Sequence, residues 1–424
     1  MMIRSLISRW FKPGALPPEH RHNFIHLVAD IAWYGALNGS SLSFLTIYAA
    51  RAGASPEQIG WINAAPAIMT LLFSLPTGAL LEKRPVHSML IRTAILHRSF
   101  FVALALLPLW GPASLQVKVL IAAVFLFYIP GAALSVSFNA LFVEVVPAEW
   151  RAWVTGMRNA AFAVVTILTS LLCGYILSVV PFPTGYVGVF LIGVIGAGMS
   201  TVHLYLIRPP LREAGAIPSQ GASQPLATAL LGIVSDYRRV FHFELLRSPF
   251  RYILLIMLGF HLAQYLPVPL FPVYTVNALG ISDQYISWGN ALFFLAVFVG
   301  STQLVQITRR LGNRKTTGLG LVLLSAFPAL LSIAHSPAVY LLANLLGGTA
   351  WSLAGGALFN YLLERVPEES RGPSLAWFNV VANAGVLLGS LAGPLIGQWL
   401  GLSLALLILA GVRFVMGWLI MRWG

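Results

Sequence analysis

The sequence predicts an all-α membrane protein with 12 transmembrane helices in two pseudo-symmetric six-helix bundles. Of the 424 residues, 58% are hydrophobic and only 9% are charged, and the apolar residues form long continuous runs. A soluble domain would carry about 25% charged residues, so a soluble enzyme, a secreted disulfide scaffold and a disordered chain are excluded. The runs lack the alternating pattern of a membrane β-barrel.

Six apolar runs precede a polar segment in the middle of the chain, and six follow it. Each is long enough for a helical span, which needs about 20 residues. The first six are 24–50, 57–81, 88–110, 117–141, 153–180 and 186–207. The second six are 250–276, 283–307, 316–334, 338–362, 373–399 and 402–423.

The polar segments define four parts of the chain. Residues 208–249, rich in Pro, Gln and Ser, have the composition of a linker. We therefore expect a tail (1–22), a first six-helix bundle (23–207), a central linker (208–249) and a second six-helix bundle (250–424). The tail is too basic and too poor in apolar residues for a cleavable signal peptide.

The basic residues predict the orientation. With the N-terminus inside the cell, nearly all loop arginines and lysines are cytoplasmic, and only Arg51 and Lys118 face outward. We therefore expect a multi-pass protein of the cytoplasmic (inner) membrane with both termini and the linker cytoplasmic. The same bias explains the net charge of +13, so no nucleic-acid partner is expected.

The two halves of the sequence resemble each other. Residues 144–151 read EVVPAEWR, and residues 364–371 read ERVPEESR, 220 positions later. An Asn follows eight residues after each segment. Because each unit has an even number of spans, the two copies have parallel orientation, related by an axis along the membrane normal.

Six plus six spans, a long middle loop and charged loops after spans two and eight resemble the major facilitator superfamily (MFS). The family signature after span two is Gly-x-Leu-x-Asp-Arg-x-Gly-Arg-Arg. This chain has Gly78, Leu80, Glu82, Lys83 and Arg84 in register, followed by Pro85 in place of the second glycine. The second copy keeps Gly312 and the base, here Arg310, but has Arg309 in place of the acid.

The resemblance implies that these loops form a cytoplasmic gate. In the family, the acid pairs with basic groups and helix N-termini across the bundle interface when the gate is shut. The alternative is that the charges only mark the membrane edge. The expected gating residues are Gly78, Glu82, Lys83, Arg84, Arg309, Arg310 and Gly312.

One acidic residue, Asp30, lies well inside a predicted span. With Tyr34 and Asn38 it follows a spacing of four, so the three side chains share one helix face. A charge in the bilayer costs roughly 2.5–3.5 kcal/mol, so a role in binding substrate or a proton is expected. In the family, spans one, four, seven and ten line the central cavity, where this face would lie.

The alternative is that Asp30 forms a permanent ion pair with a buried base. The candidates for this partner are Arg92, Arg98 and Arg158. The excess of buried bases over acids indicates an anionic cargo or a structural network, and the sequence does not separate the two.

Other polar side chains fall in the spans that the resemblance places around the cavity. His261, Gln264 and Tyr265 lie at i, i+3 and i+4 just before Pro267, and a histidine titrates near neutral pH. Asn139 lies in span four and Trp351 in span ten. With Asp30, Tyr34 and Asn38, these complete the expected substrate and proton site.

The expected function is secondary active transport of a small organic solute by alternating access, proton-coupled, with efflux favoured over uptake. The alternatives are a proton-coupled nutrient uptake permease and a non-transporting receptor or assembly factor of the same shape. No phosphate loop, HExxH or GxSxG motif occurs, so we expect no enzyme activity, cofactor or metal site. We expect a monomer whose partners are lipid, the solute and protons.

Overall fold

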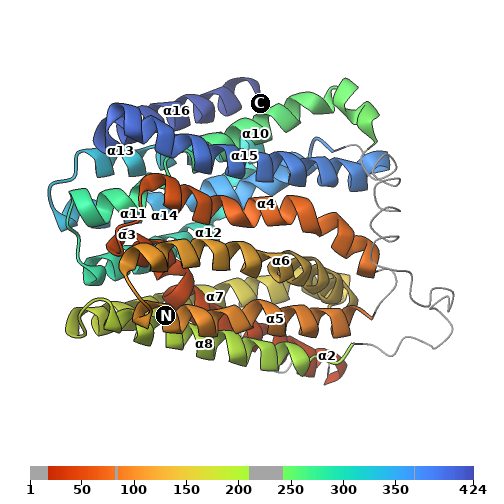
Figure 1. Cartoon of the computed structure of the whole chain (residues 1–424). Helices are drawn as coiled ribbons and strands as arrows, with labels where there is room; N and C mark the ends of the chain where they lie inside the picture. The colour runs from red at the N-terminus through yellow and green to blue at the C-terminus, as the bar shows by residue number, and fades with distance from the viewer. Residues whose placement is uncertain (1–17, 82–84, 210–241, 367) are drawn as a thin grey trace, which may run out of the picture.

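The structure is a computed structural model that describes residues 18–81, 85–209, 242–366 and 368–424. These residues are almost entirely helical, and the helices lie side by side along one direction (Figure 1). Helices of the first half, among them α5, α6, α7 and α8, occupy the lower part of this view, and α10, α15 and α16 of the second half occupy the upper part. The predicted fold class is confirmed.

The first half contains six spans. Its elements are α2 (Pro18–Leu37), η1 (Asn38–Leu42), α3 (Ser43–Arg51), α4 (Pro56–Leu81), α5 (Val86–Leu106), η2 (Leu107–Leu109), α6 (Ala113–Val145), α7 (Ala148–Val179) and α8 (Thr184–Tyr205).

The second half repeats this arrangement. Its elements are η3 (Phe243–Arg247), α10 (Phe250–Tyr265), α11 (Leu270–Val273), η4 (Tyr274–Ala278), α12 (Asp283–Leu324), α13 (Ala326–Ser332), α14 (Pro337–Leu363), η5 (Glu368–Ser370), α15 (Arg371–Leu400) and α16 (Leu402–Trp423).

Nine helical stretches of the described residues are long and apolar enough to cross a membrane. One of them, 283–332, has fifty residues and contains two spans, because Gly312 breaks α12 with φ 77° and ψ 160°. That backbone conformation suits glycine. The α2–η1–α3 stretch and α4 lie alongside these helices, an arrangement consistent with the twelve spans that the sequence predicts.

The spans lining the interior are broken more often than the apolar runs predict. Span one changes from α2 to α3 through the π-helical segment η1, where the Ser40 hydroxyl donates to the Ala36 carbonyl. Span seven is divided between α10, α11 and the π-helix η4. Such breaks are tolerated in a membrane where neighbouring helices satisfy the freed backbone groups, and π segments are frequent at functional sites.

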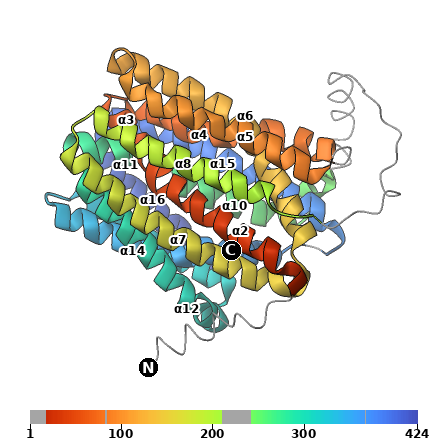
Figure 2. The ribbon, with the colours of Figure 1, turned by 90° about the horizontal axis from the view of Figure 1, so that it is seen from below.

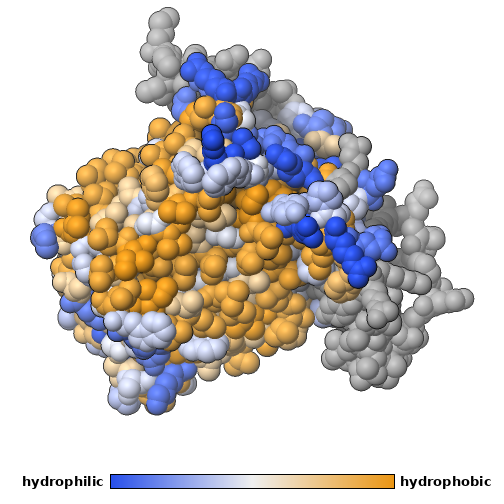
Figure 3. All heavy atoms as spheres, turned by 90° about the horizontal axis from the view of Figure 1, so that it is seen from above, coloured by the Kyte–Doolittle hydropathy of each residue, from blue (hydrophilic) through white to orange (hydrophobic). Residues whose placement is uncertain are grey.

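The most extensive contacts between the halves join α7 with α12 and α4 with α15, and α3 also packs against α11 and η4. Within the first half, α2 lies between α7 and α8 (Figure 2). Apolar side chains cover most of the face shown in Figure 3, and hydrophilic ones gather toward its edges. We call the end of the bundle where α8 ends and α10 begins the linker face, and the end where α3 leads into α4 the opposite face.

Candidate functional site

A polar cavity of about 410 Å³ lies inside the first half. Residues of α2, α4, α5, α6, α7 and α8 border it, so its walls are formed by this half's own helices. Its volume is in the range of small-molecule sites. The polar residues that line it are Asp30, Tyr34, Thr70, His97, Arg98, Tyr128, Ser135 and Arg158.

Asp30 lies between two arginines. Arg158 Nη1 donates a 3.3 Å hydrogen bond to Asp30 Oδ2, and Arg98 Nη2 lies 3.8 Å from Oδ1. The hydroxyl of Ser200 on α8 donates to Oδ1. Asp30 is only 3% exposed, so both carboxylate oxygens are engaged by protein groups.

The two guanidinium groups are less fully engaged than the carboxylate. Arg98 Nη1 donates to Thr201 Oγ1 at 2.7 Å, and its buried Nε has no hydrogen-bond partner in the described part of the chain. Arg158 Nη1 also donates to the Leu27 carbonyl, and its guanidinium lies 4.6 Å from the centre of the Phe138 ring. Each guanidinium has five N–H donors, so most of those on this pair have no acceptor among the described residues.

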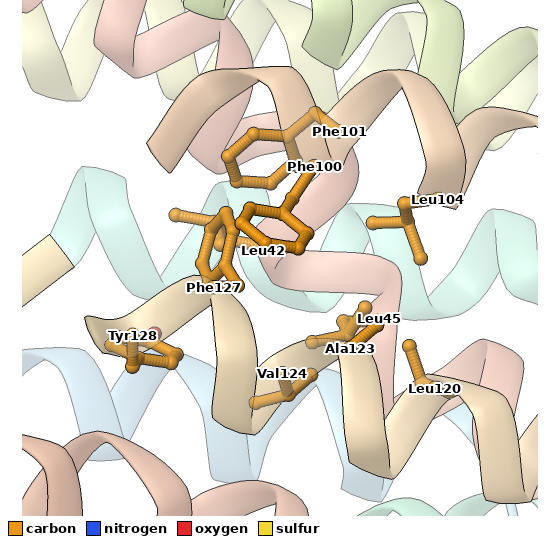
Figure 4. Close-up of a pocket in the computed structure, with 10 residues that line it drawn as sticks. All are labelled: Leu42, Leu45, Phe100, Phe101, Leu104, Leu120, Ala123, Val124, Phe127 and Tyr128. Carbon is orange, nitrogen blue, oxygen red and sulfur yellow. The ribbon is translucent and has the colours of Figure 1, made fainter. Parts of the chain in front are cut away.

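Aromatic side chains form the rest of the wall. His97 stacks on Phe127 with 4.0 Å between ring centres, and its Nδ1 has no partner among the residues described. Tyr128 borders both this cavity and a small apolar pocket beside Phe100, Phe101 and Phe127 (Figure 4). The apolar pocket holds only about 30 Å³. A second cavity of about 410 Å³, lined mostly by apolar residues of α12 and α14, lies in the second half, and none of its described lining residues is charged.

The second-half residues predicted for the site lie elsewhere. His261 Nδ1 is 2.8 Å from the Met257 carbonyl, and its ring packs against Phe378. The Gln264 Oε1 is buried without a partner in the described ranges. Trp351 packs against the hydrophobic core of the second half.

Tyr265 is the residue of this group that approaches the first half. It lies in the neighbourhood of Tyr128, which borders the cavity. The walls of the polar cavity are therefore built by the first half, and Tyr265 is the predicted second-half residue nearest to them.

Three predicted residues of the first half do not border the cavity either. Asn38 begins the π-helix η1 and is half-buried, and Asn139 is exposed near the linker-face end of α6. Arg92 is exposed on α5 and forms no ion pair with any described residue. Of the three arginines considered for Asp30, the structure brings Arg98 and Arg158 to it.

The predicted gating residues are described only in part. Glu82, Lys83 and Arg84 lie outside the described residues. Gly78 has open space where a Cβ would point, and Arg309 and Arg310 are exposed. Gly312 sits at the break in α12, where its positive φ explains the glycine.

An ion pair joins the halves at the opposite face, where the sequence analysis proposed no gate. Arg51 Nε and Nη2 each lie 3.2 Å from Asp283 Oδ1, and Nη2 also donates to the Ile281 carbonyl at 2.5 Å. Gln398 donates to Glu57 nearby. The hydrogen bonds that join described residues of the two halves all lie toward this face. One sign of this ion pair was present in the sequence: Arg51 is one of only two basic residues expected at the opposite face.

A third buried arginine occupies the second half. Arg413 on α16 is 1% exposed and donates to the carbonyls of Ala263, Gln264 and Leu324. Prolines at 267 and 328 have no N–H to donate four residues back, so the carbonyls of Ala263 and Leu324 lack helical partners. The contact joins residues up to 150 positions apart. The only sign of it in the sequence was the pair of prolines, which leave carbonyls free.

The described residues contain no group of three or more His, Cys, Asp or Glu side chains arranged to hold a metal ion. The one cysteine, Cys173, is buried and free.

The comparisons with known proteins agree with the fold. The sequence model of the Major Facilitator Superfamily matches residues 24–277 and 253–424. A search of curated protein sequences found no match.

Several solved structures share the architecture. The D-xylose-proton symporter has 16% identity and a TM-score of 0.69, covering 94% of this chain and 97% of that one. A variant of the nucleoside transporter NupG has 14% identity and a TM-score of 0.66, covering 94% and 99%. A bacterial metal transporter has 15% identity and a TM-score of 0.62, covering 95% and 99%. At these identities the likeness establishes the fold alone.

Proposed function

This chain belongs to the major facilitator superfamily, and on that premise we propose that it is a secondary active transporter that moves a small organic solute by alternating access. The observation that carries the proposal is the polar cavity inside the first half. Ionisable groups within a membrane bundle are costly and mark solute or ion pathways. Here Asp30, Arg98 and Arg158 border open space large enough for a solute.

The contacts between the halves support alternating access. The Arg51–Asp283 pair closes the opposite face, and its side chains are only 23% and 13% exposed. Opening the pathway on that side requires this pair to separate. We propose that it acts as a latch on the state seen here and that transport breaks and re-forms it.

We also propose that the linker face is cytoplasmic. Arg247, Arg309, Arg310, Arg371 and Arg422 lie at or near that end, whereas the opposite face has Arg51 and Lys118. The excess of positive charge fits the positive-inside rule. The latch would then face the outside of the cell.

For the driving force we propose a proton gradient, with His261 as the protonation site. Asp30 is held by three side chains, so we assign it to positioning the arginines. His261 is half-buried, and only its Nδ1 is engaged, by Met257. The His261→Gln variant should therefore lose the pH dependence of transport while retaining solute counterflow.

Transport can be tested with purified full-length protein in proteoliposomes. Counterflow of labelled xylose, uridine, benzoate and lactate should show saturable movement of at least one solute. A second test uses the double variant Arg51→Cys with Asp283→Cys, whose two thiols are bridged by a short bifunctional reagent. This locks the opposite face and should stop counterflow. No solute movement and no proton movement would contradict transport and favour a receptor or assembly role.

A further inference from the structure

The arginine pair in the first half has more positive charge than the protein neutralises. Two guanidinium groups face one carboxylate, so the cluster of Arg98, Arg158 and Asp30 carries one excess positive charge. No other Asp or Glu lines the cavity within the described residues. Buried charges are normally paired, so an anion that enters the cavity would complete the pairing.

Several N–H donors of the two guanidinium groups also have no acceptor among the described residues. Arg98 is tied by one hydrogen bond to Thr201, and its distance of 3.8 Å from Asp30 is too long for a second. Its Nε is buried and unpartnered, with the side chain only 7% exposed. A planar guanidinium recognises a carboxylate through two parallel N–H donors, and Arg98 and Arg158 retain such donors beside the cavity.

From these observations we infer that the cavity binds a compact organic monoanion whose carboxylate contacts Arg98 and Arg158. This inference rests on the transport function proposed above and names the class of its solute. One carboxylate neutralises the single excess charge. A dianion would leave a buried negative charge, and a neutral solute would leave the positive one.

The walls define the rest of the ligand. Phe138 packs against the guanidinium of Arg158, and Tyr34 and Tyr128 present further aromatic faces with hydroxyl groups. Aromatic rings and hydroxyls around 410 Å³ fit a ring or short chain with one or two polar substituents. The neighbouring 30 Å³ pocket leaves no room for a long alkyl tail.

The alternative is a purely structural triad in which the arginines only hold α2, α5, α7 and α8 together. Arg413 shows what such an arginine looks like in this chain. Each of its three nitrogens donates to a backbone carbonyl, and it does not line any of the cavities described above. Arg98 and Arg158 differ on both points.

The inference can be tested by binding of three anions to the purified full-length protein in detergent. Benzoate, salicylate and lactate are each compared with the amide of the same skeleton, by calorimetry at constant ionic strength. We expect at least one anion to bind about tenfold or more tightly than its amide, the ratio that a charge-assisted hydrogen bond supplies. Equal affinity of all three anions and their amides would overturn the inference.

Two variants locate the binding. Arg158→Gln should abolish the preference for the anion, whereas Arg92→Gln, on an exposed face of α5, should leave it unchanged. In case Arg158→Gln unfolds, Ser135→Glu adds a carboxylate to the cavity wall without removing an arginine. It should also abolish the preference, and Ser135→Gln is its neutral match. Anion preference that survives in both Arg158→Gln and Ser135→Glu would place the site elsewhere and overturn the inference.

The anion inference and the transport proposal can be contradicted independently of each other. Anion binding with no counterflow of any solute would contradict the proposed transport function and leave the binding site in place. Counterflow of xylose or uridine, with no anion preferred over its amide, would uphold transport and overturn the anion inference.

Discussion

The two halves each bury arginine within the bilayer-spanning helices, but they satisfy it differently. In the second half, Arg413 donates to the carbonyls of Ala263, Gln264 and Leu324. In the first half, Arg98 and Arg158 share one carboxylate and border open space. The halves repeat each other in architecture, so the difference between them lies in these side chains.

The comparison teaches that burial alone does not distinguish a structural cation from a functional one. All three arginines are at most 8% exposed. What differs is the number of donors left without an acceptor and the presence of free volume beside them. In the second half, helix breaks at prolines supply carbonyls that satisfy Arg413. In the first half, Arg98 and Arg158 keep donors that no described residue accepts, and these are the donors that the proposed anion would engage.

The largest expected effect is on stability in the second half. Arg413→Met should lower the free energy of unfolding by about 3 kcal/mol or more, because three buried carbonyls lose their donor. Thermal unfolding in detergent measures this. Arg422→Gln, an exposed arginine on the same helix, is the control and should be near neutral. A stable Arg413→Met protein would remove the distinction between the two regions.

A loss of stability of similar size is expected from Asp30→Asn. Without the carboxylate, Arg98 and Arg158 remain as buried charges that repel each other, at a cost of about 3 kcal/mol. The double variant Asp30→Asn with Arg158→Gln should recover part of this loss, since the repulsion is then gone. If the double variant is less stable than either single one, the two guanidinium groups do not oppose each other in the folded protein.

Thr201→Val tests how firmly Arg98 is held. It removes the 2.7 Å hydrogen bond to Nη1 and should cost about 1 kcal/mol of stability. Because Arg98 then loses its anchor, affinity for an anion should fall by a few-fold. The same unfolding assay and the calorimetric titration give both values. If Thr201→Val lowered the stability as much as Arg413→Met, then Arg98, like Arg413, would be a structural arginine.

The smallest effect is expected at Arg92. It lies six residues before Arg98 on α5 but is exposed, so Arg92→Gln should change stability by less than about 0.5 kcal/mol. Transport and anion binding should also be unchanged. A clear loss of either would indicate a contact of Arg92 beyond those the structure describes.

The sequence predicted the fold well because its signals are local and repeated. Long apolar runs give the spans, and the match of 144–151 with 364–371 gives the duplication. The break at Gly312 follows from the residue type. The π-helical segments η1 and η4 could not be predicted, because they depend on packing and on hydrogen bonds such as that of Ser40.

The site was predictable only in part. Asp30 stands out as a carboxylate within an apolar run, and Arg98 and Arg158 could be named as possible partners. Ser200 and Thr201 were missed because a hydroxyl in a membrane helix most often bonds its own backbone. The Arg51–Asp283 pair joins positions 232 residues apart, a separation that no local pattern reveals.

The central claim is that the pathway opens to one side at a time, and labelling at Ser135 tests it most directly. Ser135 is exposed and lines the cavity, and the native Cys173 is buried. A membrane-impermeant thiol reagent should modify Ser135→Cys from the linker face, and from the opposite face only when Arg51→Gln removes the latch. Equal modification from both faces with the latch intact would contradict the account.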